Sequence, residues 1–201
     1  MSRRPNPRAE MLRQAVAEEA GRIMHEQGVD DFLLAKRKAA ERLGVVDGSI
    51  LPRNTEIEAA LVARQRLFSA DRHAADIADL RRTALEAMLL LADFQPRLVG
   101  PVLAGTASAH SEINLHLFAE TPESVSLLLE ERGIPHQLLE RRLRFERERS
   151  STFPALRFVA GQQPVDAVVF PLDGIRQSPF SPVDGRPMRR ASAAEIRALL
   201  D

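Results

Sequence analysis

The sequence contains no cysteine, no tryptophan and no tyrosine. Without cysteine the chain can form neither disulfides nor thiolate metal sites, and it has no cysteine nucleophile. Nine phenylalanines are the only aromatic residues, which leaves the core to leucine, valine, isoleucine and alanine. With 201 residues, of which 44% are hydrophobic, the chain is long enough for one domain of ordinary size or a smaller domain with a helical extension.

Neither sign of charge is in excess, because 28 Lys and Arg residues balance 28 Asp and Glu residues. Nothing global attracts the chain to nucleic acid or to an acidic membrane, so a polyanion-binding surface would have to be a local patch. No run approaches the 18 apolar residues of a transmembrane helix, and Met1–Glu19 lacks the apolar region of a secretory signal. We therefore expect a cytoplasmic protein with no membrane partner. Lys36 and Lys38 are the only lysines, a usage typical of a GC-rich bacterial genome.

Helical periodicity dominates the chain up to about Pro96. Four helices are predicted there: 8–27, one capped by Asp30 or Asp31 and ending at Gly44, one from Thr55 to about Phe68, and one from about Asp71 to Phe94. The third is predicted to begin with a capping box formed by Thr55 and Glu58.

Beyond Pro96, short apolar runs alternate with turns. The pattern predicts strands over 97–104, 113–119, 137–145, 155–160 and 164–171, the last two joined by a turn at Gly161. It also predicts a helix opened by Thr121-Pro122 and ended by Gly133, and a final helix capped by Ser192 and Glu195. The expected fold is α/β, or mixed α+β, with a helical region at 1–95 followed by an α/β domain at 96–201.

The most informative residues lie in this second half. An apolar strand leads into the turn Gly100–Thr106, and Ser111-Glu112-Ile113-Asn114-Leu115 follows it. Asp166 stands in a later apolar run, Val165–Val169. Carboxylates on neighbouring strands beside a glycine turn can hold a metal-bound triphosphate, and an alternating pattern places both polar residues on one strand face.

This order of motifs resembles the nucleotidyltransferase superfamily over roughly residues 97–171. The superfamily pattern has Gly-Ser, then Gly-Thr, then Ser-Asp-h-Asp-h, and a third acid about fifty to sixty residues later (h is apolar). The resemblance implies a nucleotidyltransferase-like mixed sheet. It also implies transfer of a nucleoside monophosphate from an NTP to a hydroxyl acceptor, with Mg²⁺ as cofactor and RNA or a protein as a possible acceptor.

The resemblance assigns roles to seven residues. Those implied to be catalytic are Glu112, Asn114 and Asp166, and Glu112 and Asp166 are implied to bind the metal. Those implied to bind the nucleotide are Gly100, Gly105, Thr106 and Ser111.

Two departures favour a second hypothesis. Pro101 stands where the superfamily has serine, and proline has neither a backbone N–H nor a hydroxyl. Asn114 keeps an acceptor oxygen but lacks the charge of aspartate, which leaves two formal negative charges instead of three. The alternative is a catalytically degenerate member that acts as a nucleotide-, RNA- or protein-binding module. A third hypothesis is an unrelated α+β interaction protein.

Other charged segments have open interpretations. Lys36-Arg37-Lys38 with Arg42 is typical of a solvated helix face, and it could also contact an RNA backbone. The alternating arginines and glutamates of 140–149 indicate a salt-bridged surface. Residues 182–190 either line the nucleotide pocket or tie the C-terminal helix to the sheet.

Overall fold

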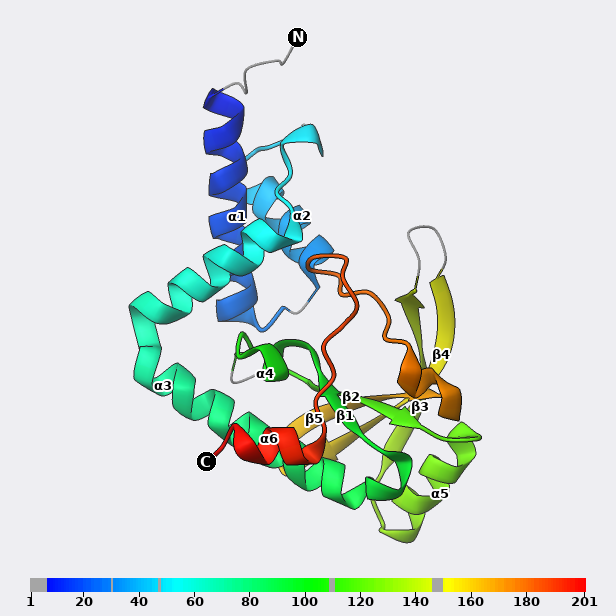
Figure 1. The fold of residues 1–201 in the computed structure, drawn as a ribbon. Coiled ribbons are helices and arrows are strands. Elements are labelled where there is room, and N and C mark those ends of the chain that lie inside the picture. Colours follow the sequence, from blue (N-terminus) through cyan, green and yellow to red (C-terminus); the bar gives the residue numbers. More distant parts are fainter. Residues whose placement is uncertain (1–6, 30, 47, 109–110, 146–149) are drawn as a thin grey trace. The chain divides into compact units, whose positions relative to one another are not determined.

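The computed structural model describes residues 7–29, 31–46, 48–108, 111–145 and 150–201 (Figure 1). These residues form two compact units. One unit comprises the described residues up to His73 with Pro182–Asp184, and the other comprises the described residues from Ala74 to Ser181 with Gly185–Asp201. Within the described ranges, no helix has the length and the apolar character needed to cross a membrane.

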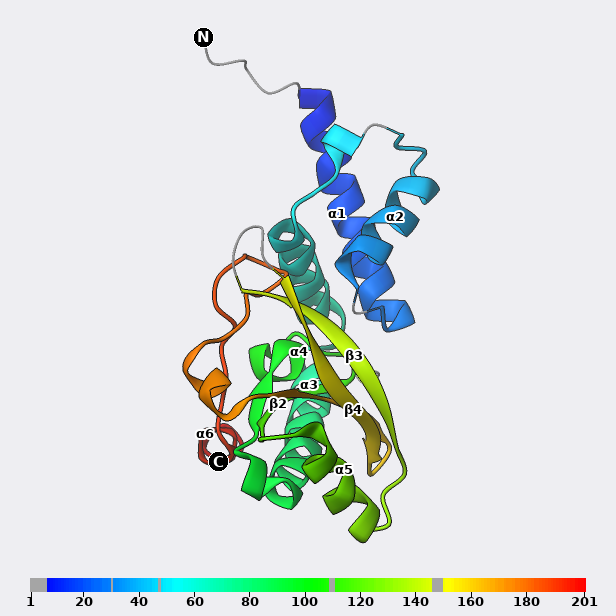
Figure 2. The ribbon, with the colours of Figure 1, turned by 90° about the vertical axis from the view of Figure 1, so that its right-hand side faces the viewer.

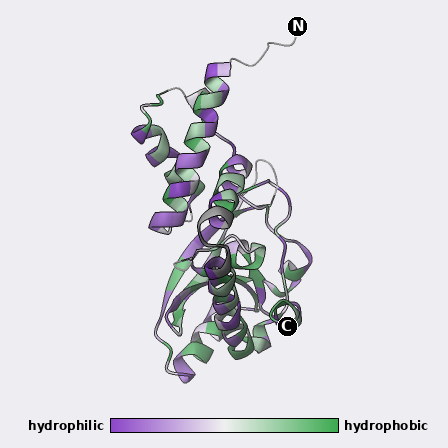
Figure 3. Ribbon diagram, turned by 90° about the vertical axis from the view of Figure 1, so that its left-hand side faces the viewer, coloured by the Kyte–Doolittle hydropathy of each residue, from purple (hydrophilic) through white to green (hydrophobic). Residues whose placement is uncertain are grey.

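The first unit is helical. It contains α1 (Pro7–Gln27), α2 (Phe32–Arg42), the short 3-10 helix η1 (Gly48–Ile50) and the first part of α3 (Asn54–Leu90). Asp31 caps α2 as predicted, because its carboxylate accepts from the N–H groups of Leu33 and Leu34; Asp30 lies outside the described residues. The apolar stripes of the helices meet in a core, and in Figure 3 the colour of α1 alternates along the helix accordingly. The fully buried residues of this core are Val16, Ala20, Ile23, Ala35, Ala39 and Ile57.

Helix α3 differs from the prediction of two helices separated near residues 68–71. It runs without interruption for 37 residues. The segment contains neither Gly nor Pro, and Ser or Asp inside a helix costs less than about 0.7 kcal/mol each. The helix also begins at Asn54, and the backbone N–H of Arg53 donates to Glu56 at 2.5 Å in place of the predicted box of Thr55 and Glu58.

The second unit is built on a five-stranded mixed sheet with the order β1-β2-β5-β4-β3. Strands β2 and β5 are parallel, and every other neighbouring pair is antiparallel. The strands are β1 (Arg97–Val99), β2 (Ile113–Phe118), β3 (His136–Arg144), β4 (Ser150–Ala160) and β5 (Gln163–Phe170). Figure 2 shows β3 and β4 as the long twisted pair of the sheet. The predicted α+β class is confirmed.

The predicted strand 97–104 is wrong beyond Val99. The chain leaves the sheet at Gly100, whose φ is +72°, and then forms α4 (Gly100–Ala104). Pro101 suits the first turn of a helix because its missing N–H is not needed there. Gly105, with a φ of +80°, ends this single turn.

The two faces of the sheet have different coverings. One face packs in a core that includes side chains of α3, α5 (Pro122–Glu131) and α6 (Ala193–Ala198). On the opposite face, one end carries an apolar cluster of Phe118, Ala155, Val168 and Phe170, with Ile175 of the 3-10 helix η3 (Leu172–Arg176) packed against it. The other end of this second face carries polar side chains.

Candidate functional site

Asn114 and Asp166 define the polar end of the second sheet face. They are Cα partners in the parallel pair of β2 and β5. Since directly opposite residues point to the same side of a sheet, the two side chains share this face. Glu112 precedes Asn114 by two residues and therefore lies on the same side. The structure thus brings the three residues predicted to be catalytic to one place.

Each of the two carboxylates is held by an arginine. Arg157 of β4 is the Cα partner of Asp166, and its guanidinium forms an ion pair with Glu112. To reach Glu112 beside β2, the Arg157 side chain has to cross β5, which lies between the two strands. The guanidinium therefore lies between the strands that carry Glu112 and Asp166.

Asp166 is bound by Arg141 of β3. Arg141 Nε donates to one carboxylate oxygen at 2.8 Å, and its Nη2 donates to the other at 2.9 Å. This is the bidentate geometry in which an arginine binds a carboxylate most strongly. The Asp166 side chain is 8% exposed, whereas that of Glu112 is 29% exposed. The Asp166 pair is therefore the better shielded of the two.

We call Glu112, Asn114, Arg141, Arg157 and Asp166 the polar cluster. Its formal charges sum to zero, with two acids against two guanidiniums. The two arginines were not assigned to a site by the sequence pattern. Arg141 belongs to the segment expected to be a salt-bridged surface, of which 146–149 lie outside the described residues. Arg157 carried one detectable signal, a charge inside the apolar run Ala155–Val159.

The Gly100 turn lies directly beside Asn114. A Cβ added to Gly100 would lie 3.3 Å from Nδ2 of Asn114, and a positive φ disfavours any other residue at this position. Both features favour glycine at position 100. Asn114 Nδ2 also makes a long contact of 3.4 Å to the carbonyl of Glu112.

The other residues predicted to bind nucleotide lie further along this turn. The N–H groups of Gly105 and Thr106 both donate to the carbonyl of Pro101, at 2.8 and 3.0 Å, and so close the end of α4. Ser111 is buried, and its hydroxyl accepts from the N–H of Ser108 at 3.0 Å. These hydrogen bonds of Gly105, Thr106 and Ser111 hold the end of α4 and the residues that follow it.

His116 continues the polar side of β2 toward the apolar cluster. Burial lowers its pKa to about 3, with a further contribution from the positive charge of Arg190, so the ring is neutral at pH 7. Arg190 Nε donates to His116 Nδ1 at 3.0 Å, which places the ring hydrogen on Nε2.

The contacts of Arg190 show what the C-terminal end of the segment 182–190 does. Arg190 Nη1 donates to the carbonyls of Gly174, Ile175 and Gln177. Its guanidinium also lies over the rings of Phe118 and Phe170, 5.0 and 5.1 Å from their centroids. Leu98 and Ala191 exchange backbone hydrogen bonds next to it. This part of the segment ties the approach to α6 onto the sheet, which is one of the two predicted alternatives.

The donors of the polar cluster suit a hard divalent cation in kind, because carboxylate and amide oxygens are the ligands that Mg²⁺ prefers. In the arrangement described, however, both carboxylates are engaged by guanidiniums. Within the part of the chain that the structure describes, no group of three or more His, Asp or Glu side chains could hold a metal ion. The residues fit Mg²⁺ only if an arginine leaves its acid.

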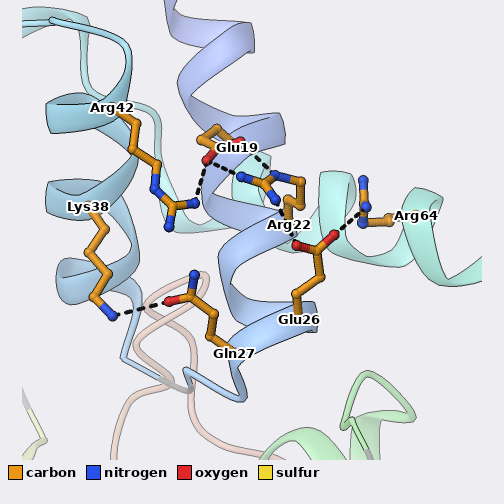
Figure 4. Close-up of polar contacts among 7 residues, drawn as sticks. All are labelled: Glu19, Arg22, Glu26, Gln27, Lys38, Arg42 and Arg64. Carbon is orange, nitrogen blue, oxygen red and sulfur yellow. Dashed lines mark hydrogen bonds and ion pairs between the residues drawn. The ribbon is translucent and has the colours of Figure 1, made fainter.

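The basic segment of α2 is bound within the helical unit (Figure 4). Arg42 donates to Glu19 at 2.9 Å, and Lys38 donates to Gln27 at 3.2 Å. Glu19 also binds Arg22, and these bonds lower its pKa to about 2. Glu26 joins Arg22 to Arg64 of α3. Lys38 and Arg42 therefore bind residues of α1, whereas the sequence pattern predicted a solvated helix face and, as the alternative, contact with an RNA backbone.

Comparison of the chain with protein-family models, with curated proteins and with solved structures finds no match.

Proposed function

We propose that this protein binds a nucleoside triphosphate, with the phosphates at the polar cluster beside the Gly100 turn. The observation that carries the proposal is the register of β2 and β5, which sets Asn114 opposite Asp166 with Glu112 on the same face. The resemblance of residues 97–171 to the nucleotidyltransferase superfamily points to the same residues. The proposal includes the degenerate form of that site, a module that binds a nucleotide without transferring part of it.

The arginines support phosphate binding. A guanidinium matches two phosphate oxygens with its planar fork of N–H donors. Arg157 is 39% exposed and Arg141 is 35% exposed, so both can be reached from solvent. Asp166 keeps the Arg141 guanidinium in place before a ligand arrives, which reduces the entropy lost on binding.

Titration calorimetry with each of the four NTPs, in excess MgCl₂ and separately in EDTA, tests the proposal. We expect at least one NTP to bind. We expect each of the variants Asn114→Ala and Arg157→Gln to bind it more weakly than the wild-type protein. Arg82→Gln serves as the matched control, since Arg82 pairs with Asp79 on α3, away from the polar cluster. A wild-type protein that unfolds cooperatively yet binds none of the NTPs would refute the proposal.

A second candidate function is transfer of a nucleoside monophosphate to a hydroxyl. One observation favours it: the Glu112–Arg157 pair is partly exposed, and such pairs contribute only about 0–1 kcal/mol, so a ligand can open it. Bound Mg²⁺ would neutralise the phosphates and lower the pKa of the attacking hydroxyl. Release of pyrophosphate that requires Mg²⁺ and is lost in Glu112→Gln would establish transfer. Binding in EDTA without pyrophosphate release would establish the binding module.

A further inference from the structure

In the Glu112–Arg157 pair, the Arg157 side chain occupies the space that a metal ion between Glu112 and Asp166 would need. Arg157 extends from β4 across β5 to Glu112 beside β2. Neighbouring strands lie about 4.8 Å apart, so the side chain spans roughly two strand spacings. A cation shared by Glu112 and Asp166 would lie in the same space, because Asp166 is on the strand that the side chain crosses.

The charge of the polar cluster leads to the same conclusion. Two guanidiniums already neutralise the two carboxylates, so a divalent cation entering the cluster would meet no net negative charge. Metal binding by the ligand-free protein is therefore weak while Arg157 stays on Glu112. A triphosphate changes this charge balance, because it offers Arg157 a bidentate partner that carries more negative charge than one carboxylate.

The two pairs differ in how readily they open. Arg141 holds Asp166 through two hydrogen bonds, and Asp166 is almost fully buried. Arg157 and Glu112 are both partly exposed, at 39% and 29%. The exposed pair opens first, because solvent and ligand can compete for its atoms.

We infer that Arg157 exchanges partners: it holds Glu112 in the ligand-free protein and moves to a phosphate group of the bound triphosphate, which frees Glu112 for a divalent cation. This inference rests on the proposed function, because it assumes that a triphosphate binds at the polar cluster. It assigns Arg157 as a phosphate-binding residue that also blocks the metal position.

The test uses two ligands that should respond in opposite directions to one substitution. Binding of MnCl₂ alone is followed by the electron paramagnetic resonance signal of free Mn²⁺, and binding of inorganic tripolyphosphate is followed by calorimetry in EDTA. In Arg157→Gln we expect Mn²⁺ to bind about 10-fold more tightly and tripolyphosphate about 10-fold more weakly. Loss of fold alone would weaken both ligands, so the opposite signs identify the exchange.

Two further variants keep the test decisive. Glu112→Gln releases Arg157 without removing it, so tripolyphosphate should bind more tightly and Mn²⁺ more weakly. Arg142→Gln is the matched control, because Arg142 is exposed and donates to Ser150 on the neighbouring strand; both affinities should stay at the wild-type value.

The outcomes separate the two claims. If wild-type protein binds an NTP and Arg157→Gln leaves Mn²⁺ binding unchanged or weaker, the exchange is refuted and the proposed function stands. If folded wild-type protein binds neither an NTP nor tripolyphosphate, both are refuted.

Discussion

Asn114 and Asp166 are directly opposite each other on parallel strands, and a Cβ added to Gly100 would lie 3.3 Å from Nδ2 of Asn114. The side chain of Asn114 is therefore placed by the sheet register on one side and by Gly100 on the other. A change at Gly100 should reach the polar cluster even though glycine has no side chain.

Gly100→Ala should lower the free energy of unfolding by about 2–3 kcal/mol. About 1–2 kcal/mol comes from a side chain at positive φ, and the rest comes from displacing Asn114, whose Nδ2 would lie 3.3 Å from the new Cβ. Gly133→Ala is the matched control, because Gly133 has a φ of +66° and no atom within 4 Å of an added Cβ. Urea denaturation of both variants measures the difference, and equal losses would show that Asn114 is not displaced.

Removing Arg141 should destabilise the protein more than removing its neighbour. Arg141→Ala leaves the buried carboxylate of Asp166 without its bidentate partner, which should cost on the order of 3 kcal/mol. Arg142→Ala removes one exposed hydrogen bond to Ser150 and should cost about 0.5–1 kcal/mol. Chemical denaturation at pH 7 compares them, and a loss below 1 kcal/mol for Arg141→Ala would mean that Asp166 finds another partner.

The stability of the second unit should fall with acidification, starting from about pH 6.5. Folded His116 has a pKa of about 3, against 6.5 as its reference value, so the unfolded state takes up the proton first. The contribution is fully present above pH 6.5 and is lost as the pH falls toward 3. Between pH 7 and pH 5 the loss should reach about 2 kcal/mol.

A glutamine side chain at position 116 can still accept a hydrogen bond from Arg190 and does not titrate. His116→Gln should therefore remove most of the dependence of the unfolding free energy on pH between pH 7 and pH 5. Glu19, with a pKa of about 2 against its ordinary value of 4.5, contributes only below about pH 5, outside the window from pH 7 to pH 5. Unfolding curves at half-unit pH intervals give the slope. An unchanged slope in His116→Gln would assign it to another group.

Arg190→Lys should loosen the segment that follows β5. Lysine has a compact ammonium and cannot reproduce the planar contacts of Arg190 with three carbonyls and with His116. We expect faster amide exchange over residues 172–177 and a loss of about 1–3 kcal/mol of stability. The control is Arg189→Lys, since Arg189 is exposed. Unchanged exchange in Arg190→Lys would show that other contacts hold the segment.

Local patterns predicted much of the secondary structure. The segments that became α1, α2, β2, β3 and β5 were predicted to within one or two residues, and α6 follows the predicted Ser192–Glu195 capping box, which forms both of its bonds. The turn at Gly161 is also present, with a φ of +60°. These features depend on periodicity and on capping residues within a few positions of one another.

The errors arose where local signals compete. Strand propensity in 97–104 favoured one long strand, but Gly100 and Pro101 end it after Val99. Cap-like residues at 69–71 suggested a break in α3, yet no Gly or Pro enforces one. In both places the decisive factor was the presence or absence of a residue that constrains φ.

The partners of the candidate acids could not be predicted from local patterns. Arg141 and Arg157 lie 25 and 9 positions before Asp166, and only the strand order and register bring them to it. The charge of Arg141 is typical of a surface arginine, and the charge of Arg157 inside an apolar run does not identify its partner, until the pairing of β3, β4 and β5 is known. The predicted acids were visible because their spacing follows the alternation of a single strand.

The parallel pairing of β2 and β5 also has a kinetic consequence. Ile113 pairs with Val165, so about fifty residues must be closed into a loop before the pair can form, and closure of this kind is slow compared with hairpin formation. The hairpins of β3, β4 and β5 involve shorter loops and can form first. The alignment of Asn114 with Asp166 should therefore appear in the last refolding phase, after most of the secondary structure has been regained.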